Sequence, residues 1–168
     1  MVQLKTLVQD KRPFGDSEHV LSLEKLKEIY DVTLPMETST EFYNFNSKIV
    51  HDNYISLKTY FGCNINTQEK NIAAKVITPI FKTFFSKDLV RKFTAQKKSK
   101  DEYIFKDSKF YDCLFDAMQN AHSKKGQTVT NADLLGLIGT VINNAADWDR
   151  GRDSRKRTRD QDSDGNDI

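Results

Sequence analysis

The chain has 168 residues, 38% of them hydrophobic, which is enough for one domain with tails and too little for two full cores. Its 26 basic and 24 acidic residues leave a net charge of +2, so no strong overall field directs it to nucleic acid or to a membrane, and any basic surface must be local. No apolar run approaches the roughly 18 residues of a transmembrane helix, and we expect a soluble, unsecreted protein with no membrane partner.

The N-terminus is predicted to form an arm, extended or loosely docked, because residues 1–17 have weak periodicity and contain a Lys-Arg-Pro-Phe-Gly break. Residues 18–149 are predicted to form a helical domain. Apolar residues recur there at spacings of three and four, and the whole chain has only 7 glycines and 3 prolines. This pattern indicates an all-α fold, a compact bundle of about six or seven short to medium helices.

Three short helices are predicted after the arm. The first covers residues 22–30. Thr38 and Glu41 have the spacing of a capping box, in which each side chain satisfies a free backbone N–H, so a helix is expected to begin there. The third helix lies around residues 53–61, with Gly62 as its C-terminal stop.

The longest apolar stripe predicts the core helix, over residues 68–85. Pro79 lies inside this range, so the helix either kinks there or consists of two segments, one of which begins close to the proline. Ser86 is a good N-cap for a further short helix. Residues 103–105 are predicted to form a short extended piece.

Two capped helices complete the predicted domain. One begins at Ser108, and the last begins at Thr130 and ends near Trp148. Gly136 and Gly139 lie inside the last helix, where each costs about 1 kcal/mol relative to alanine. These two glycines are therefore candidates for a close helix crossing.

A disordered tail is predicted over residues 150–168, where Ile168 is the only apolar side chain. Its first ten positions hold six basic residues, and residues 160–168 hold four aspartates and no base. Clustered basic residues in a flexible stretch are recognised by nuclear import receptors. The alternative role of such a cluster is non-specific binding of phosphates. We predict a nuclear location, with the import signal formed by Arg155, Lys156, Arg157 and Arg159.

The sequence contains no catalytic or metal-binding motif. Its three histidines are scattered and are expected at the surface, whereas Cys63 and Cys113 are expected to be reduced and packed in or near the core. Asp112 and Asp116 have the spacing of neighbours on a solvated helix face, which is the alternative to a pair of acid–base carboxylates. We therefore expect a non-enzymatic protein without catalytic residues, metal or cofactor.

Basic residues are concentrated between Lys82 and Lys109. That stretch has nine basic and four acidic residues, a local net charge of +5, whereas the rest of the predicted domain has more acidic than basic residues. A basic loop between helices would contact phosphates without regard to base sequence. The alternative is a solvated lysine-rich loop without a ligand.

The chain resembles BEN domains in three stretches. Residues 77–90 are similar to the start of that domain, where an apolar helix ends in a Phe-Ser step before an acidic-leucine turn. Residues 106–118 resemble its next helix and residues 130–152 its closing helix, so the BEN-like part covers about residues 70–149. In addition, residues 34–45 are similar to a segment that precedes the BEN-like part in an uncharacterised helical family of transposon-associated animal proteins.

This resemblance implies a helical module that binds DNA or chromatin proteins and often self-associates, with the closing helix and the neighbouring loops approaching DNA. Asparagine can pair with adenine, and arginine with guanine or a phosphate. Carried over to this chain, the implied nucleic-acid-binding residues are Lys92, Lys97, Lys98, Lys100, Asn143, Arg150 and Arg152.

The sequence thus predicts a non-enzymatic nuclear adaptor that binds DNA or chromatin proteins through a basic loop and a basic tail and is recognised by an import receptor. The alternative is a protein-interaction or self-association module, possible as a homo-oligomer, that does not bind nucleic acid. Under that alternative, some of the 11 Phe, 6 Tyr and 1 Trp side chains form an exposed patch for a partner.

Overall fold

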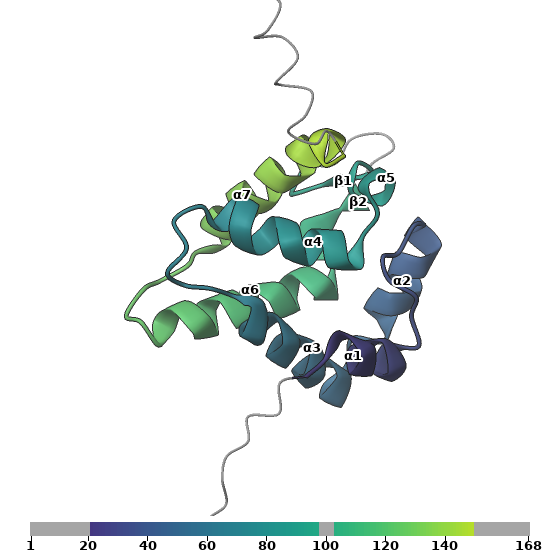
Figure 1. Ribbon diagram of the computed structural model, residues 1–168, viewed down its shortest axis with the longest axis horizontal. Helices are drawn as coiled ribbons and strands as arrows, with labels where there is room; N and C mark the ends of the chain where they lie inside the picture. The colour runs from purple at the N-terminus through teal and green to yellow at the C-terminus, as the bar shows by residue number, and fades with distance from the viewer. Residues whose placement is uncertain (1–20, 98–102, 150–168) are drawn as a thin grey trace, which may run out of the picture.

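This computed structural model describes residues 21–97 and 103–149. These residues contain seven α-helices and one two-stranded parallel sheet (Figure 1). The predicted all-α bundle is confirmed, because each strand has only two residues. The predicted arm, the start of the domain at residue 18 and the tail lie outside the described residues. None of the described helices is long and apolar enough to cross a membrane.

The three longest helices are α3, α6 and α7, and the last two of them close the described part of the chain. In chain order they are α1 (Leu23–Tyr30), α2 (Ser39–Ser47), α3 (His51–Asn64), a π-helical turn (Ala73–Ile77), α4 (Thr78–Phe84), α5 (Lys87–Val90), β1 (Phe93–Thr94), β2 (Tyr103–Ile104), a 3₁₀ turn (Phe105–Asp107), α6 (Lys109–Ser123), α7 (Asn131–Asn144) and a second 3₁₀ turn (Ala145–Asp147). The small sheet lies between α7 and α2 (Figure 1).

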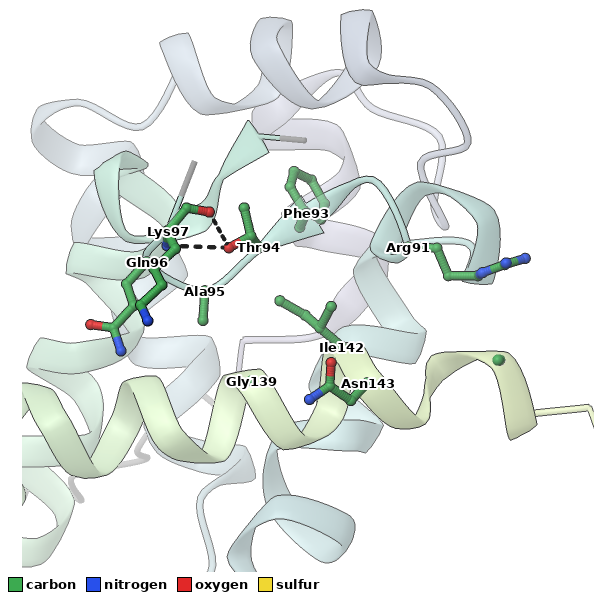
Figure 2. Close-up of a pocket in the computed structure, with 10 residues that line it drawn as sticks. Arg91, Phe93, Thr94, Ala95, Gln96, Lys97, Gly139, Ile142 and Asn143 are labelled. Atoms are coloured by element: carbon green, nitrogen blue, oxygen red, sulfur yellow. Dashed lines mark hydrogen bonds between the residues drawn. The ribbon is translucent and has the colours of Figure 1, made fainter. Parts of the chain in front are cut away.

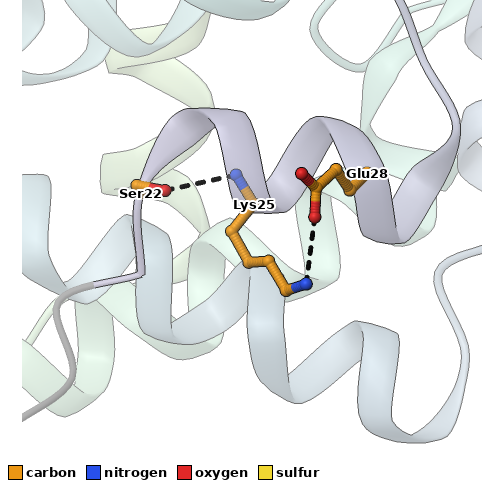
Figure 3. A network of polar contacts seen from close by, with 3 residues as sticks. All are labelled: Ser22, Lys25 and Glu28. Atoms are coloured by element: carbon orange, nitrogen blue, oxygen red, sulfur yellow. Dashed lines mark hydrogen bonds and ion pairs between the residues drawn. The ribbon is translucent and has the colours of Figure 1, made fainter.

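Side-chain caps begin five of these helices. Four of them are residues predicted as caps, and the fifth is Ser22, where the first helix is predicted to begin. A cap satisfies an amide that no helical carbonyl can reach, so its position depends on local sequence alone. An exposed ion pair on α1, Lys25–Glu28 at 3.0 Å, adds little because solvent screens it (Figure 3). Each cap accepts a hydrogen bond from the backbone amide three residues ahead, at 3.1–3.2 Å: Ser22 (Figure 3), Thr38, Ser86, Ser108 and Thr130.

The third helix, α3, is longer than predicted, and Gly62 does not end it. Gly62 lies inside the helix, where a Cβ atom would meet no other atom within 4 Å. The helix ends before Ile65, whose backbone is extended and whose side chain is buried in the core. The burial of Ile65 therefore decides the end of α3, and the glycine does not.

The predicted core helix consists of two segments, as one of the two alternatives for Pro79 requires. A π-helical turn, in which the Thr78 amide donates to the Ala73 carbonyl, leads directly into α4. Pro79 lies in the first turn of α4, the part of a helix where proline is best tolerated. The chain thus accommodates the proline without breaking the apolar stripe that faces the core.

Aromatic rings from distant parts of the chain meet around Phe85, at the end of α4. The ring of Phe85 lies 5.0–6.3 Å, centroid to centroid, from those of Phe42, Phe81, Phe84, Phe93, Phe105 and Phe110. Its backbone is also held, because the Met36 amide donates to the Phe84 carbonyl and the Ser86 amide to the Met36 carbonyl, both at 2.8 Å. One continuous core therefore joins α2, α4, the sheet and α6.

Two expectations about reactive side chains are wrong. His122 is buried, with 4% of its surface exposed, because the last turn of α6 folds its ring inward and Nδ1 lies 2.9 Å from the Met118 carbonyl. Cys113 is buried as predicted, but Cys63 is exposed near the end of α3. The interior of the domain therefore holds one cysteine and one histidine among the described residues.

The aspartate pair on α6 is only partly the solvated pair that the sequence predicts. Asp112 is exposed, whereas Asp116 is half-buried and accepts a hydrogen bond from the Tyr54 hydroxyl of α3. Partial loss of hydration beside α3, and then the charge of Asp116, raise the pKa of Asp112. The Tyr54 bond joins α3 to α6, which gives Asp116 a structural role that local spacing does not reveal.

Replacing Phe85 with alanine should destabilise the domain by about 3–5 kcal/mol, because the substitution leaves a cavity among six rings. Phe115→Ala is the matched control, since Phe115 is only half-buried and stacks on the single ring of Tyr111. Urea unfolding followed by tryptophan fluorescence gives both values. Equal losses for the two variants would show that the ring cluster around Phe85 has no central role.

The two capping boxes should make the domain sensitive to acid. Hydrogen bonds from the backbone of Glu37 and Thr38 lower the pKa of Glu41, and bonds from Thr130 lower that of Asp133. A carboxyl whose pKa is lower in the folded than in the unfolded state stabilises the fold above its unfolded pKa, and this contribution is lost as the pH falls through the folded pKa.

We therefore expect the melting temperature to fall as the pH drops below about 4, the ordinary carboxyl range. In the double variant Glu41→Gln, Asp133→Asn the fall should be shallower, because neither side chain can be protonated. Calorimetry from neutral pH into acid measures this, with Glu24→Gln on the exposed face of α1 as control. If the melting temperature of the double variant falls with pH as steeply as that of the unmodified chain, the two capping carboxyls are not the source of the acid sensitivity.

Candidate nucleic-acid interface

A groove of about 460 Å³ lies between the β1 segment and the C-terminal half of α7 (Figure 2). Arg91 lies at one end of it and Lys97 at the other, while Asn143 and Ile142 of α7 face the strand between them (Figure 2). The groove thus joins two parts of the chain that are far apart in sequence. Its described lining residues are Arg91, Phe93, Thr94, Ala95, Gln96, Lys97, Gly139, Ile142, Asn143 and Ala146.

The floor of the groove is made of small residues. A Cβ atom on Gly139 would lie 3.9 Å from the Cβ atom of Ala95, which is an ordinary contact, and one on Gly136 would meet nothing within 4 Å. The expected close helix crossing at these glycines is therefore wrong, because the neighbour of Gly139 is the segment after β1 and not another helix. Small side chains here leave room for a ligand to approach the backbone.

Hydrogen bonds fix the wall that carries Lys97. The Thr94 hydroxyl donates to the Lys97 carbonyl at 2.6 Å and accepts from the Lys97 amide at 3.2 Å (Figure 2). The Lys106 amide donates to the Ala95 carbonyl at 3.1 Å, which ties the same segment to the residues after β2. The backbone of Lys97 is thus positioned while its side chain stays exposed to solvent.

The groove is electropositive by composition, because its described lining holds Arg91 and Lys97 and no acidic residue. Asp149, beyond the end of α7, is engaged elsewhere: its carboxylate lies 2.6 Å from the ammonium group of Lys87 on α5. The hydrogen bond and the charge of Lys87 hold the pKa of Asp149 below its ordinary value. Although this pair is exposed and weak, it offsets an acidic charge that would otherwise repel a polyanion from this end of the helix.

The structure brings together only some of the residues implied by the resemblance. Lys97 and Asn143 line the same groove, whereas Lys92 is exposed beside it and does not line it. Arg91 lines the groove but was not among the predicted binding residues, although it belongs to the basic stretch of the sequence. The remaining predicted residues lie outside the described ranges: Lys98, Lys100, Arg150, Arg152 and the import residues Arg155, Lys156, Arg157 and Arg159.

A second groove, of about 640 Å³, lies between α3 and the C-terminal half of α6. Ile55 lines it with 62% of its surface exposed, and Ala117 and Ala121 of α6 stand on its other side. The lining mixes these apolar side chains with polar and basic ones, among them Lys58 and Lys124. Within residues 21–97 and 103–149, no group of three or more His, Cys, Asp or Glu side chains is arranged to hold a metal ion.

Comparisons of the chain with protein-family models, with curated proteins and with solved structures gave no match. The functional argument therefore depends on the two grooves and on the residues around them.

Proposed function

We propose that this chain is a non-enzymatic, BEN-like nuclear adaptor that binds DNA or chromatin through the groove between β1 and α7. The observation that carries the proposal is that Arg91, Lys97 and Asn143 line one groove whose described lining holds no acid. Two cations at opposite ends of the groove and an amide between them suit a phosphodiester backbone that runs along it. The small residues of the floor allow that backbone to come close.

The chemistry of these three side chains divides into two kinds of contact. Arg91 and Lys97 are exposed cations, which bind phosphates by charge and release counterions from the nucleic acid. Asn143 is exposed on α7 and can both donate to and accept from a base edge. Affinity is thus expected to come mainly from charge, with a small contribution from base readout.

The sequence supports two further parts of the proposal. The resemblance of residues 77–90, 106–118 and 130–152 to BEN domains favours DNA or chromatin as the partner, and in that resemblance the closing helix and its neighbouring loops approach the DNA. The basic run from Arg155 to Arg159 favours recognition by an import receptor and hence a nuclear location.

The groove between α3 and α6 favours a second candidate function, self-association or the binding of another protein. Ile55 is the most exposed of the large hydrophobic side chains among the described residues, and small side chains beside it permit close approach of a helix. This candidate does not require nucleic acid, so the two functions can be tested separately.

The double variant Arg91→Ala, Lys97→Ala should bind duplex DNA more weakly on all sequences. Because each phosphate contact contributes about one unit to the slope of log affinity against log salt, that slope should fall by about 2. Fluorescence anisotropy of a labelled duplex, titrated from low to physiological salt, measures it. Lys125→Ala, which removes an exposed lysine that lies just after α6 and lines neither groove, is the control and should leave the slope unchanged.

A slope that stays the same in the double variant would remove the groove from the proposal. Absence of binding by the unmodified chain at low salt would overturn DNA binding by this chain altogether.

If the second candidate function includes self-association, sedimentation velocity should show a mass that rises with concentration in the absence of nucleic acid. Ile55→Lys should then return the protein to the monomer, because it replaces the most exposed apolar side chain of the groove with a charge. A monomer at every concentration would count against self-association.

A further inference from the structure

Two tyrosines, Tyr43 of α2 and Tyr103 of β2, form an exposed aromatic pair outside both grooves. They are 49% and 37% exposed, and their ring centroids lie 5.4 Å apart with the ring planes almost perpendicular. No other pair of the large hydrophobic side chains exposed in the described residues is in aromatic contact, since the remaining two are Val50 and Ile55. The pair therefore presents π surface to solvent at a place where the fold does not require it for its core.

Both rings are supported from beneath by the aromatic core. Tyr43 lies 6.1 Å from Phe42 and Tyr103 lies 6.5 Å from Phe93, centroid to centroid. Phe42 and Phe93 are buried and are themselves 5.0 Å apart. Because the two tyrosines form the outer layer of this packing, little side-chain freedom remains to be lost when a ligand binds them.

The aromatic pair is continuous with the groove between β1 and α7. The sheet pairs Tyr103 with Phe93, which lines that groove, and the Tyr103 amide donates to the Lys92 carbonyl at 2.8 Å. Lys92, the residue before Phe93, is exposed and adds a cation to this part of the chain. The groove and the tyrosine pair are thus joined through the backbone of the two-stranded sheet.

The pair carries no charge that would repel a polyanion. Partial loss of hydration, and then the neighbouring Tyr103, raise the pKa of Tyr43 above the ordinary tyrosine value, which itself lies well above physiological pH. The charged side chains in the turn before β1 and in the segment after it are Arg91, Lys92 and Lys97, all exposed and all basic. These cations favour an anionic ligand, and the two tyrosine rings favour one that brings flat rings.

We propose that Tyr43 and Tyr103 are a stacking platform for unpaired bases of a single-stranded nucleic acid whose backbone lies in the groove between β1 and α7. The inference rests on the proposed function and narrows it to strands with accessible base faces. In a duplex the base faces are covered by their neighbours, so only an unpaired base can offer its π surface to a tyrosine. Stacking of this kind tolerates any base, whereas the cations beside the platform hold the phosphates.

The test compares the binding of single strands and of a duplex by three double variants. The probes are fluorescein-labelled oligo(dT) and oligo(rU) of about 15 nucleotides, within the range bound by single-strand-binding domains, and a hairpin duplex of similar length. The variants are Tyr43→Ala with Tyr103→Ala, Tyr43→Phe with Tyr103→Phe, and Arg91→Ala with Lys97→Ala. Val50→Ala, which truncates an exposed apolar side chain that lines neither groove, is the matched control.

The unmodified chain should bind a single strand more tightly than the hairpin. The double alanine variant should lose about 5- to 100-fold in affinity for the single strand and little for the hairpin, because a stacked base contributes that much. The double phenylalanine variant should keep the affinity, since it keeps both rings, and the Arg91, Lys97 variant should lose affinity for both probes. The dT and rU arms show whether DNA or RNA is the preferred source of the strand.

A second measurement uses the unmodified chain only and does not depend on how a variant folds. An abasic strand of the same length keeps every phosphate but has no base to stack, so it should bind more weakly than oligo(dT).

Equal affinity for abasic and normal strands, or an unchanged affinity in the double alanine variant, would overturn the stacking platform. Salt-dependent binding of the hairpin would in that case leave the proposed function standing. If neither the single strand nor the hairpin binds at low salt, both the stacking platform and the proposed function are wrong. If replacing the two tyrosines reduces self-association instead, the pair belongs to a protein interface.

Discussion

The packing of phenylalanine rings around Phe85 is the interaction on which the rest of this fold depends. Helices α1, α2 and α5 are short, and short helices in isolation are marginal in water, so they need tertiary contacts to persist. Phe42 of α2 packs against Phe85, and Tyr30 of α1 lies 4.5 Å from Phe45 of α2. Phe93 and Phe105 bring two further elements to the same cluster. The same rings hold β1 and β2 together, although two strands of two residues each have too few hydrogen bonds to be stable alone. The candidate interface is therefore carried by the core, because both its wall and its tyrosines rest on buried phenylalanines.

Features that depend on neighbours in sequence could be predicted, and features that depend on distant packing could not. Ser22, Thr38 and Ser108 cap their helices because a cap needs only an amide three residues ahead. The end of α3 depends on the packing of Ile65 in the core, and the burial of His122 depends on the packing of α6 against other parts of the chain. Glycine spacing could not show that Gly139 faces Ala95, since that contact joins segments 44 positions apart.

The candidate interface was predictable in part for the same reason. Charge density pointed to the region of Lys97, and the resemblance pointed to Asn143, but only the fold places them along one groove. Arg91 and the tyrosines were missed because nothing in the sequence indicates that Phe93 pairs with Tyr103 or that Tyr43 packs against Tyr103. Long-range pairing of short strands leaves almost no periodic signal, since two residues cannot show an alternation.

The parallel pairing of β1 with β2 has a consequence for how this surface can evolve. The segment between the two strands is anchored at both ends, by the register of Thr94 with Ile104 and by the bond from Lys106 to Ala95. The entropy of closing a loop rises only slowly with its length, so residues can be inserted or lost between these anchors at small cost to stability. Descendants of this chain are thereby free to lengthen, shorten or recharge the segment, and so to change ligands, while the scaffold that presents it stays the same.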